Sequence, residues 1–149
     1  MDQSIKKRRF SKGSLPLYNI QMFLIFQNPD TRFTQVMRQY SWLENDLAGV
    51  DRALTPWLVV YGHRPMYCTN NDRDDCTVFE TRTRTGLPLT KWWPLEPLLA
   101  QYGVDLAVWA HEHSYERLLP TYNRKVVPSQ DPAAPYSQPR ATVHITTGY

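Results

Sequence analysis

The sequence is poor in cysteine and glycine, with two cysteines and six glycines among its 149 residues. So few cysteines exclude a small domain held together by many disulfides. Twelve prolines against six glycines indicate ordered loops rather than flexible linkers. The chain also lacks a run of about 18 apolar residues, which a transmembrane helix needs, and we expect no membrane partner. Apolar residues make up 42% and charged residues 21%, which exclude a wholly disordered chain and fit a single globular domain.

Positive charge is concentrated near the start of the chain. The net charge is +3, and residues 6–9 are four consecutive basic residues. This run and the apolar residues 15–26 imitate a signal peptide, but proline, asparagine and glutamine interrupt the apolar part and no small-residue cleavage site follows. The basic run has no interleaved aromatic residues, so we expect a solvated tail and no nucleic-acid partner. Residues 1–19 are therefore expected to be a disordered basic tail that precedes a domain of residues 20–149.

The rest of the sequence alternates predicted strands and helices. Apolar residues at steps of three and four predict helices at 33–47 and 94–102, each followed by a glycine that ends it. Short apolar runs predict buried strands at 20–26, 57–61, 104–110 and 141–147. Residues 62–89 show no periodicity and are expected to form one long loop. This order predicts an α/β fold with a partly parallel sheet covered by helices.

Three of the four histidines follow predicted strands. His63 comes after the strand at 57–61, and His111 and His113 come after the next strand in the sheet. Because a strand–helix–strand crossover makes these strands parallel, their carboxyl ends lie at the edge where open α/β sheets bind ligands. A lone histidine at a strand end is more often structural, but three at one edge favour a metal such as zinc, iron or manganese. An extended backbone would direct His111 and His113 to the same side. His144, inside the last strand, is predicted to be structural.

The polar residues around these histidines leave alternatives open. Glu112 is expected to project outward, as a free charge or as a partner of Arg117. Residues 114–117 can supply hydrogen bonds that orient the imidazoles. The alternative is a structural ion pair between Glu116 and Arg117.

The two cysteines, Cys68 and Cys76, have seven residues between them. This spacing does not match the C-x-x-C of redox or zinc sites. The cysteines are either free thiols or a local disulfide, which the turn-forming residues 70–75 make feasible. On chain-entropy grounds such a bridge would stabilise the fold by about 2–3 kcal/mol, and it would indicate an oxidising compartment. We predict that the two cysteines are close enough to bridge.

The motifs around the histidines resemble those of the purple acid phosphatases, a branch of the calcineurin-like metallophosphoesterases. Residues 60–65 (VYGHRP) and 110–113 (AHEH) are similar to the V-x-x-H and G-H-x-H motifs of that larger family, with alanine at 110 in place of glycine. Further segments resemble purple acid phosphatases or their animal branch; these are residues 40–44, 66–68, 102–106 and 115–117. The resemblance implies that residues 20–149 are the C-terminal portion of a catalytic domain. Its fold would be part of a four-layer α/β/β/α sandwich, truncated at the N-terminus.

The resemblance also implies an acid phosphatase, secreted or lysosomal, that hydrolyses phosphate monoesters with two metals. One metal is ferric iron and the other is zinc, manganese or ferrous iron. His63 and His111 match ligands of the divalent metal, and His113 matches a ligand of the iron.

Several upstream motifs of the family, G-D-x-G, G-D-x-x-Y and G-N-H, have no counterpart, because the sequence contains no Gly-Asp and no Gly-Asn pair. No catalytic residue and no binding residue for another cofactor is therefore identified. We expect a fragment that is inactive alone. The alternative is a non-catalytic truncated isoform that acts at most as a metal-binding or interaction module.

Overall fold

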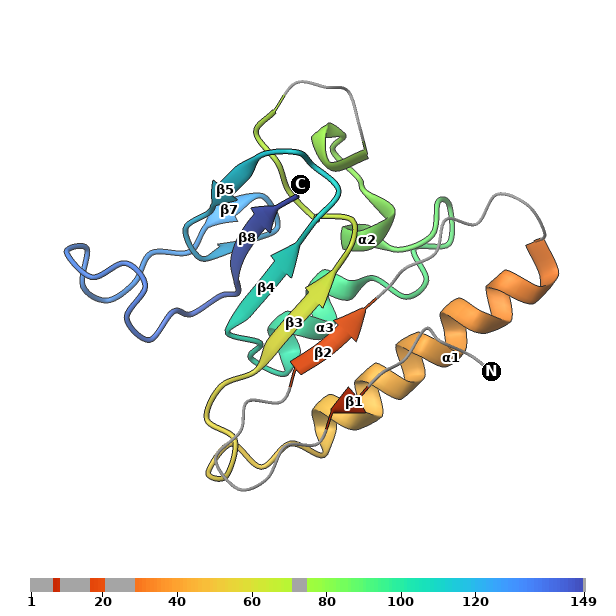
Figure 1. Ribbon diagram of the computed structural model, residues 1–149, viewed down its shortest axis with the longest axis horizontal. Helices are drawn as coiled ribbons and strands as arrows, with labels where there is room; N and C mark the ends of the chain where they lie inside the picture. Colours follow the sequence, from red (N-terminus) through yellow and green to blue (C-terminus); the bar gives the residue numbers. More distant parts are fainter. Residues whose placement is uncertain (1–6, 9–16, 21–28, 71–74, 149) are drawn as a thin grey trace.

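The computed structural model describes residues 7–8, 17–20, 29–70 and 75–148. Its strands are β1 (Lys7–Arg8), β2 (Leu17–Ile20), β3 (Val59–Gly62), β4 (Leu106–Trp109), β5 (Tyr115–Arg117), β6 (Thr121–Tyr122), β7 (Lys125–Val126) and β8 (Val143–Thr147). Its helices are α1 (Pro29–Ala48), the 3₁₀ turn η1 (Asp75–Thr77), α2 (Arg82–Thr85) and α3 (Leu95–Gln101). Six strands form one sheet in the order β1-β2-β3-β4-β8-β5, and β6 and β7 form a separate hairpin (Figure 1).

The centre of the sheet is parallel, as the sequence predicted. Strands β2, β3, β4 and β8 run in the same direction, whereas β1 and β5 are antiparallel to their neighbours. Gly62, the last residue of β3, lies opposite Trp109, the last residue of β4. The residues that follow these two strands therefore emerge side by side at one edge of the sheet.

Helices α1 and α3 pack against the same face of the sheet. Buried residues of the two helices and of β3 and β4 form a single apolar cluster, which includes Leu43, Leu47, Val60, Leu95, Leu98, Leu99, Ala107 and Trp109. The opposite face carries Val59, Leu106, Val108 and Ile145, which are only half-buried. The described residues thus form a sheet with a helical layer on one face, as expected for one part of the sandwich.

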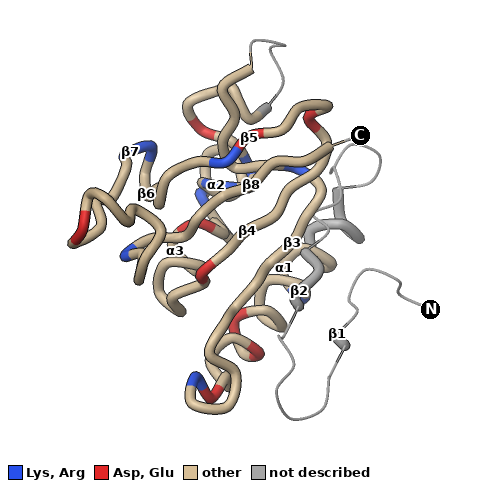
Figure 2. The backbone as a smooth tube through the Cα atoms, turned by 60° about the vertical axis from the view of Figure 1, so that its left-hand side comes forward, with Lys and Arg blue, Asp and Glu red and all other residues tan. Residues whose placement is uncertain are grey.

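Charged residues avoid the centre of the sheet. Strands β3, β4 and β8 contain no Asp, Glu, Lys or Arg, and the charges of both signs lie mainly on loops and helices (Figure 2). Apolar strands of this kind are typical of the middle of a parallel sheet. Among the described residues, none of the helices combines the length and the apolar character that crossing a membrane would require.

Most predicted elements are confirmed with small shifts, but the long loop is not. Helix α1 covers the helix predicted at 33–47 and begins earlier, and α3 lies within the helix predicted at 94–102. The prediction of an unstructured loop over residues 62–89 is wrong, because η1 and α2 form inside it. The short helix α2 is possible because the Thr81 side chain accepts a hydrogen bond from the Arg84 backbone nitrogen at its start.

Most of the tail expected over residues 1–19 lies outside the described residues. Residues 7–8 and 17–20 pair through their backbones as β1 and β2, and β2 extends the sheet beside β3. Of the strand predicted at 20–26, only Ile20 lies within the described residues.

A buried ion pair connects α2, α3 and the β6–β7 hairpin. Arg84 Nη1 lies 3.0 Å from Glu96 Oε2, and the two side chains are 3% and 8% exposed. The second oxygen of Glu96 accepts a hydrogen bond of 2.8 Å from the backbone nitrogen of Asn123 in the hairpin turn. Burial raises the pKa of Glu96, and the hydrogen bond from Asn123 opposes this shift. Removing one partner of such a pair typically costs about 3–5 kcal/mol, so the network fixes the hairpin against α3.

His144 lies in the core, in agreement with its predicted structural role. Its side chain is buried, and its Nδ1 accepts a hydrogen bond of 3.1 Å from Trp109 Nε1. Its ring also lies edge-on to Tyr67, with ring centroids 5.1 Å apart. Burial lowers the pKa of His144 to about 3, so the folded protein keeps this imidazole neutral.

This buried histidine predicts a specific loss of stability in acid. As the pH falls, the unfolded chain protonates His144 at about pH 6.5, whereas the folded protein does so only at a much lower pH. The stabilisation is complete above that pH and is lost as the pH falls towards about 3. Between these limits we expect the free energy of unfolding of the wild type to fall more steeply than that of His144→Asn, by about 1.4 kcal/mol per pH unit.

Asparagine is a suitable comparison because its amide oxygen can accept from Trp109 but does not titrate. Urea denaturation of both proteins at several pH values between 7 and 4 measures the two slopes. Equal slopes would contradict the prediction, because they would show that folding does not change the pKa of His144.

Candidate metal centre

The imidazoles of His63 and His111 meet at the carboxyl edge of β3 and β4. His111 Nδ1 lies 2.9 Å from His63 Nε2, although the residues are 48 positions apart in the sequence. The backbone nitrogen of Ala110 donates to the carbonyl oxygens of Gly62 and His63, at 3.2 and 3.1 Å. These hydrogen bonds continue the pairing of β3 and β4 beyond the ends of the strands. They thereby bring His63 and His111 close together.

The backbone turns sharply at His111. Its φ is +68°, and the Glu112 backbone nitrogen donates a hydrogen bond of 2.8 Å to the carbonyl oxygen of Ala110. These features define a γ-turn of the uncommon, strained type. Such a backbone costs on the order of 1–3 kcal/mol and persists only where surrounding contacts hold it.

The turn changes the predicted relation between His111 and His113. The expectation that the two imidazoles share a side rested on an extended backbone, which the structure does not have here. His113 instead lines an open hollow of about 440 Å³ at the end of β8, together with Ser114, Tyr115, Thr147 and Gly148. The structure thus brings two of the three predicted ligands into contact, and the described residues contain no three-histidine cluster.

The two ring nitrogens of His63 and His111 are at hydrogen-bond distance, which is also close to the separation that a shared metal ion would give them. Imidazole nitrogens bind zinc at about 2.0–2.1 Å, so two nitrogens on one ion lie about 2.9 Å apart at a right angle and about 3.3 Å apart at a tetrahedral angle. The observed separation of 2.9 Å lies at the lower end of this range. His63 is exposed and His111 is half-buried, so the pair is accessible from solvent.

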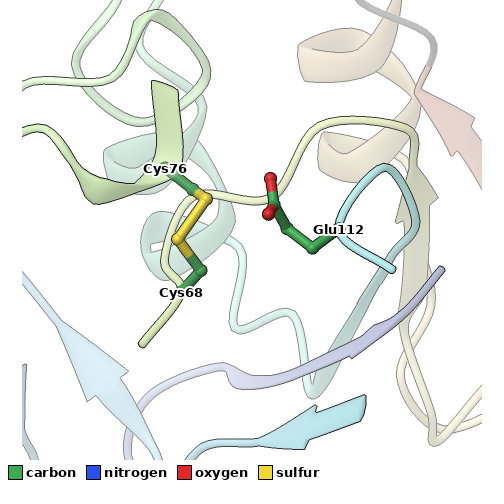
Figure 3. A group of neighbouring side chains, drawn as sticks. All are labelled: Cys68, Cys76 and Glu112. Atoms are coloured by element: carbon green, nitrogen blue, oxygen red, sulfur yellow. A yellow bond between two sulfur atoms is a disulfide. The ribbon is translucent and has the colours of Figure 1, made fainter. Parts of the chain in front are cut away.

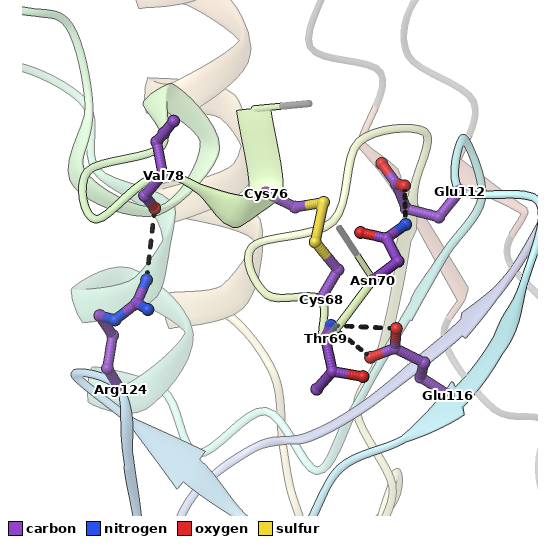
Figure 4. The surroundings of a disulfide bond; sticks show 8 residues. All are labelled: Cys68, Thr69, Asn70, Cys76, Val78, Glu112, Glu116 and Arg124. Atoms are coloured by element: carbon purple, nitrogen blue, oxygen red, sulfur yellow. Dashed lines mark hydrogen bonds between the residues drawn. A yellow bond between two sulfur atoms is a disulfide. The ribbon is translucent and has the colours of Figure 1, made fainter. Parts of the chain in front are cut away.

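Glu112 does not project outward and does not pair with Arg117, contrary to both expectations. Its side chain is only 2% exposed, and its carboxylate accepts a hydrogen bond from Asn70 Nδ2 (Figure 4). The strained turn at His111 explains the difference, because it reverses the direction that an extended segment would give to Glu112. Arg117 instead lies over the ring of Tyr136, 4.8 Å from its centroid.

Glu116 also has a different partner from the one expected. Both of its carboxylate oxygens accept from the backbone nitrogen of Thr69, at 3.0 and 2.9 Å, so the predicted Glu116–Arg117 ion pair is wrong. Hydrogen bonds to charged groups typically contribute about 1.5–3 kcal/mol each, which is comparable to the strain at His111. The sequence reasoning did not select Thr69 and Asn70, because their acceptors lie more than 40 residues away and no local pattern signals the contact.

Cys68 and Cys76 form a disulfide, as predicted, with their Cα atoms 5.5 Å apart. The two sulfurs and the Glu112 carboxylate lie within 4.8 Å of one another (Figure 3). Zinc binds thiolates, and the sulfurs of a disulfide carry no such charge, so this group is not a zinc site while the bridge is formed. The disulfide lies directly beside Thr69 and Asn70 and restricts the loop that carries them (Figure 4).

Gly148 approaches the turn from the other side. A Cβ atom at this position would lie 2.0 Å from the Glu112 carbonyl oxygen and 2.7 Å from its carbonyl carbon. These are backbone atoms of Glu112, so they cannot move aside without displacing the turn at His111. Position 148 therefore requires glycine, because any side chain there would collide with the backbone of Glu112.

We expect Gly148→Ala to lower the free energy of unfolding by about 1–3 kcal/mol, because the added methyl overpacks against backbone. Gly49→Ala is the matched control, since its Cβ would meet nothing nearer than 3.6 Å. We expect this control to change stability by less than about 0.5 kcal/mol. Urea denaturation of the two variants measures both effects, and an unchanged stability of Gly148→Ala would contradict the close approach.

The family of the chain follows from its matches to known proteins. Residues 8–115 match the calcineurin-like phosphoesterase family. The chain belongs to this family of metallophosphoesterases, and its closely similar relatives are acid phosphatases. It is 54% identical over 115 residues to acid phosphatase type 7 of Homo sapiens, which covers 76% of this chain and 26% of the human protein. It is 41% identical over 111 residues to acid phosphatase A of Cryphonectria parasitica, covering 74% of this chain and 19% of that protein.

The solved structures agree with the predicted fold. Purple acid phosphatase PPD1 isolated from yellow lupin (Lupinus luteus) seeds matches with a TM-score of 0.55 and 19% identity, covering 96% of this chain and 22% of that chain. The resemblance to purple acid phosphatases and the metallophosphoesterase fold are thus confirmed. The chain spans about a quarter or less of the length of these proteins.

Proposed function

We propose that this chain carries part of the binuclear metal centre of an acid phosphatase that hydrolyses phosphate monoesters. His63 and His111 would bind the divalent metal, which is zinc, manganese or ferrous iron, and His113 would bind iron. The observation that carries the proposal is the 2.9 Å contact between His63 and His111 at the carboxyl edge of the sheet, in a chain whose relatives are acid phosphatases. Imidazole suits these borderline metals.

The contribution of the chain is to position the ligands and the ester. When bound, two such metal ions would offset the negative charge of the ester and lower the pKa of a water molecule. The ends of β3 and β4 bring His63 and His111 within 2.9 Å of each other, which would reduce the ordering needed when a metal binds. The hollow beside His113, of about 440 Å³, is open and of a size suited to a small phosphate ester.

The disulfide supports a proposal about the compartment. Disulfides such as Cys68–Cys76 form and persist in oxidising environments. We therefore propose that the protein is secreted or lysosomal.

The ligand assignment is tested by titrating the purified chain with zinc in competition with a chromophoric chelator. We expect His63→Ala and His111→Ala each to lower the zinc affinity by at least about 10-fold, because each removes one of two facing donors. His113→Ala should change it by only a few-fold, since His113 lies apart from the pair. His144→Asn is the control for loss of an imidazole in the core. Equal affinities in all four variants would contradict the assignment.

The activity is tested by assaying residues 1–149 with iron and zinc near pH 5 on an aryl phosphate. We expect little or no turnover, because no residues matching the family's bridging aspartate and its other upstream ligands occur in the sequence. Losing one of two cations removes several kcal/mol of transition-state stabilisation, and each ~1.4 kcal/mol is tenfold in rate. Robust turnover that disappears in His111→Ala would refute this. Absence of both zinc binding and turnover would favour the alternative, a non-catalytic interaction module.

A further inference from the structure

We propose that the disulfide-linked loop at residues 68–70 positions His111 against His63, with Asn70 and Glu112 as the residues that transmit its effect. The importance of this role for metal binding rests on the proposed function, whereas the positioning itself does not. Neither Asn70 nor Glu112 would touch the metal or the substrate in this role, so both are positioning residues.

The first step is the pair of hydrogen bonds made by successive residues of the loop. The Thr69 backbone nitrogen donates to Glu116, and the Asn70 side chain donates to Glu112 (Figure 4). These two carboxylates lie on either side of His113 in the sequence. The loop therefore contacts the chain on both sides of His113, at Glu112 and at Glu116.

The second step is the link from Glu112 to His111. The backbone nitrogen of Glu112 closes the γ-turn whose central residue is His111. The buried carboxylate of the same residue is held by Asn70, and its carbonyl group lies against Gly148. A backbone with φ of +68° persists only where its surroundings over-determine it. If the hydrogen bond from Asn70 to Glu112 is lost, the turn can relax, and the His111 ring would move away from His63.

The third step is the disulfide itself. Cys68 immediately precedes Thr69 and Asn70, and its partner Cys76 is 2% exposed, so the bridge attaches this end of the loop to the protein interior. Without the bridge the loop gains conformational freedom, and its two donors would exchange their carboxylate partners for water. The disulfide is thereby coupled to the histidine pair through two hydrogen bonds.

The test follows the imidazoles directly by NMR, with no metal present. In ¹⁵N-labelled protein at one fixed pH, we expect a nuclear Overhauser effect between the rings of His63 and His111. This effect should be lost or strongly weakened in Asn70→Ala, in Glu112→Ala and in the double variant Cys68→Ala/Cys76→Ala. Glu112→Gln should retain it, because the amide oxygen of glutamine still accepts from Asn70. An unchanged effect in Asn70→Ala and in the double cysteine variant would overturn the proposal.

Two controls separate positioning from general damage. Arg124→Ala removes the 3.2 Å hydrogen bond from Arg124 to the Val78 carbonyl on the far side of the disulfide, and it should leave the histidine signal unchanged (Figure 4). The indole N–H resonance of Trp109, which donates to His144, reports whether the core of each variant is intact. If the double cysteine variant loses this resonance, its core is damaged and it is set aside. The proposal is then tested by whether the effect between the rings is lost in Asn70→Ala and retained in Glu112→Gln.

Zinc titration of the same proteins connects the positioning to the proposed function. We expect a 10- to 100-fold lower affinity in the variants that lose the histidine contact, and a change of only a few-fold in Glu112→Gln. If the wild type binds zinc and Asn70→Ala binds it equally well, the importance of the positioning for metal binding is overturned and the proposed function stands. If the wild type binds no zinc but the NMR pattern holds, the proposed function fails and the positioning role stands.

Discussion

The parallel pairing of β3 with β4 is the constraint on which the candidate site depends. It places the ends of the two strands at one level, and the Ala110 backbone nitrogen extends the pairing to the carbonyl groups of Gly62 and His63. Helices α1 and α3 stabilise the pair from one face, with Leu43 and Leu98 in the same cluster as Val60 and Ala107. The contact between His63 and His111 therefore depends on the core of the domain, and a loop alone would not fix it.

Hydrophobic patterning predicted helices α1 and α3 and strands β3, β4 and β8, but neither their limits nor the shorter elements between them. Trp57 was expected to begin a strand, yet it is 55% exposed and β3 starts two residues later. The reason is a polar contact that no apolar pattern encodes, since the Leu58 backbone nitrogen donates to Asp105, which Arg52 also binds through two nitrogens. The β6–β7 hairpin was missed because Asn123 and Arg124 both adopt positive φ, without the glycine that usually signals such a turn.

The sequence placed His63 and His111 correctly at neighbouring strand ends, because that inference needed only the order and direction of the strands. It could not place Glu112 or His113, whose positions depend on a strained turn rather than on a periodic backbone. It could not identify Asn70 either, because the Asn70–Glu112 contact joins residues 42 positions apart in two irregular segments. Regular structure was therefore predictable here, whereas long-range polar contacts between loops were not.

The close approach of Gly148 to Glu112 has a consequence for the order in which the domain assembles. The histidine turn contacts a loop far upstream at Asn70 and a residue far downstream at Gly148, so few of its contacts are local. Contacts between distant residues form slowly, because a long loop must close before they are made. During synthesis on the ribosome, the turn at His111 would thus lack its contact with Gly148 until that residue had emerged. Helix α1 and the β3–β4 pair could fold earlier, and the His63–His111 contact would take its final form after them.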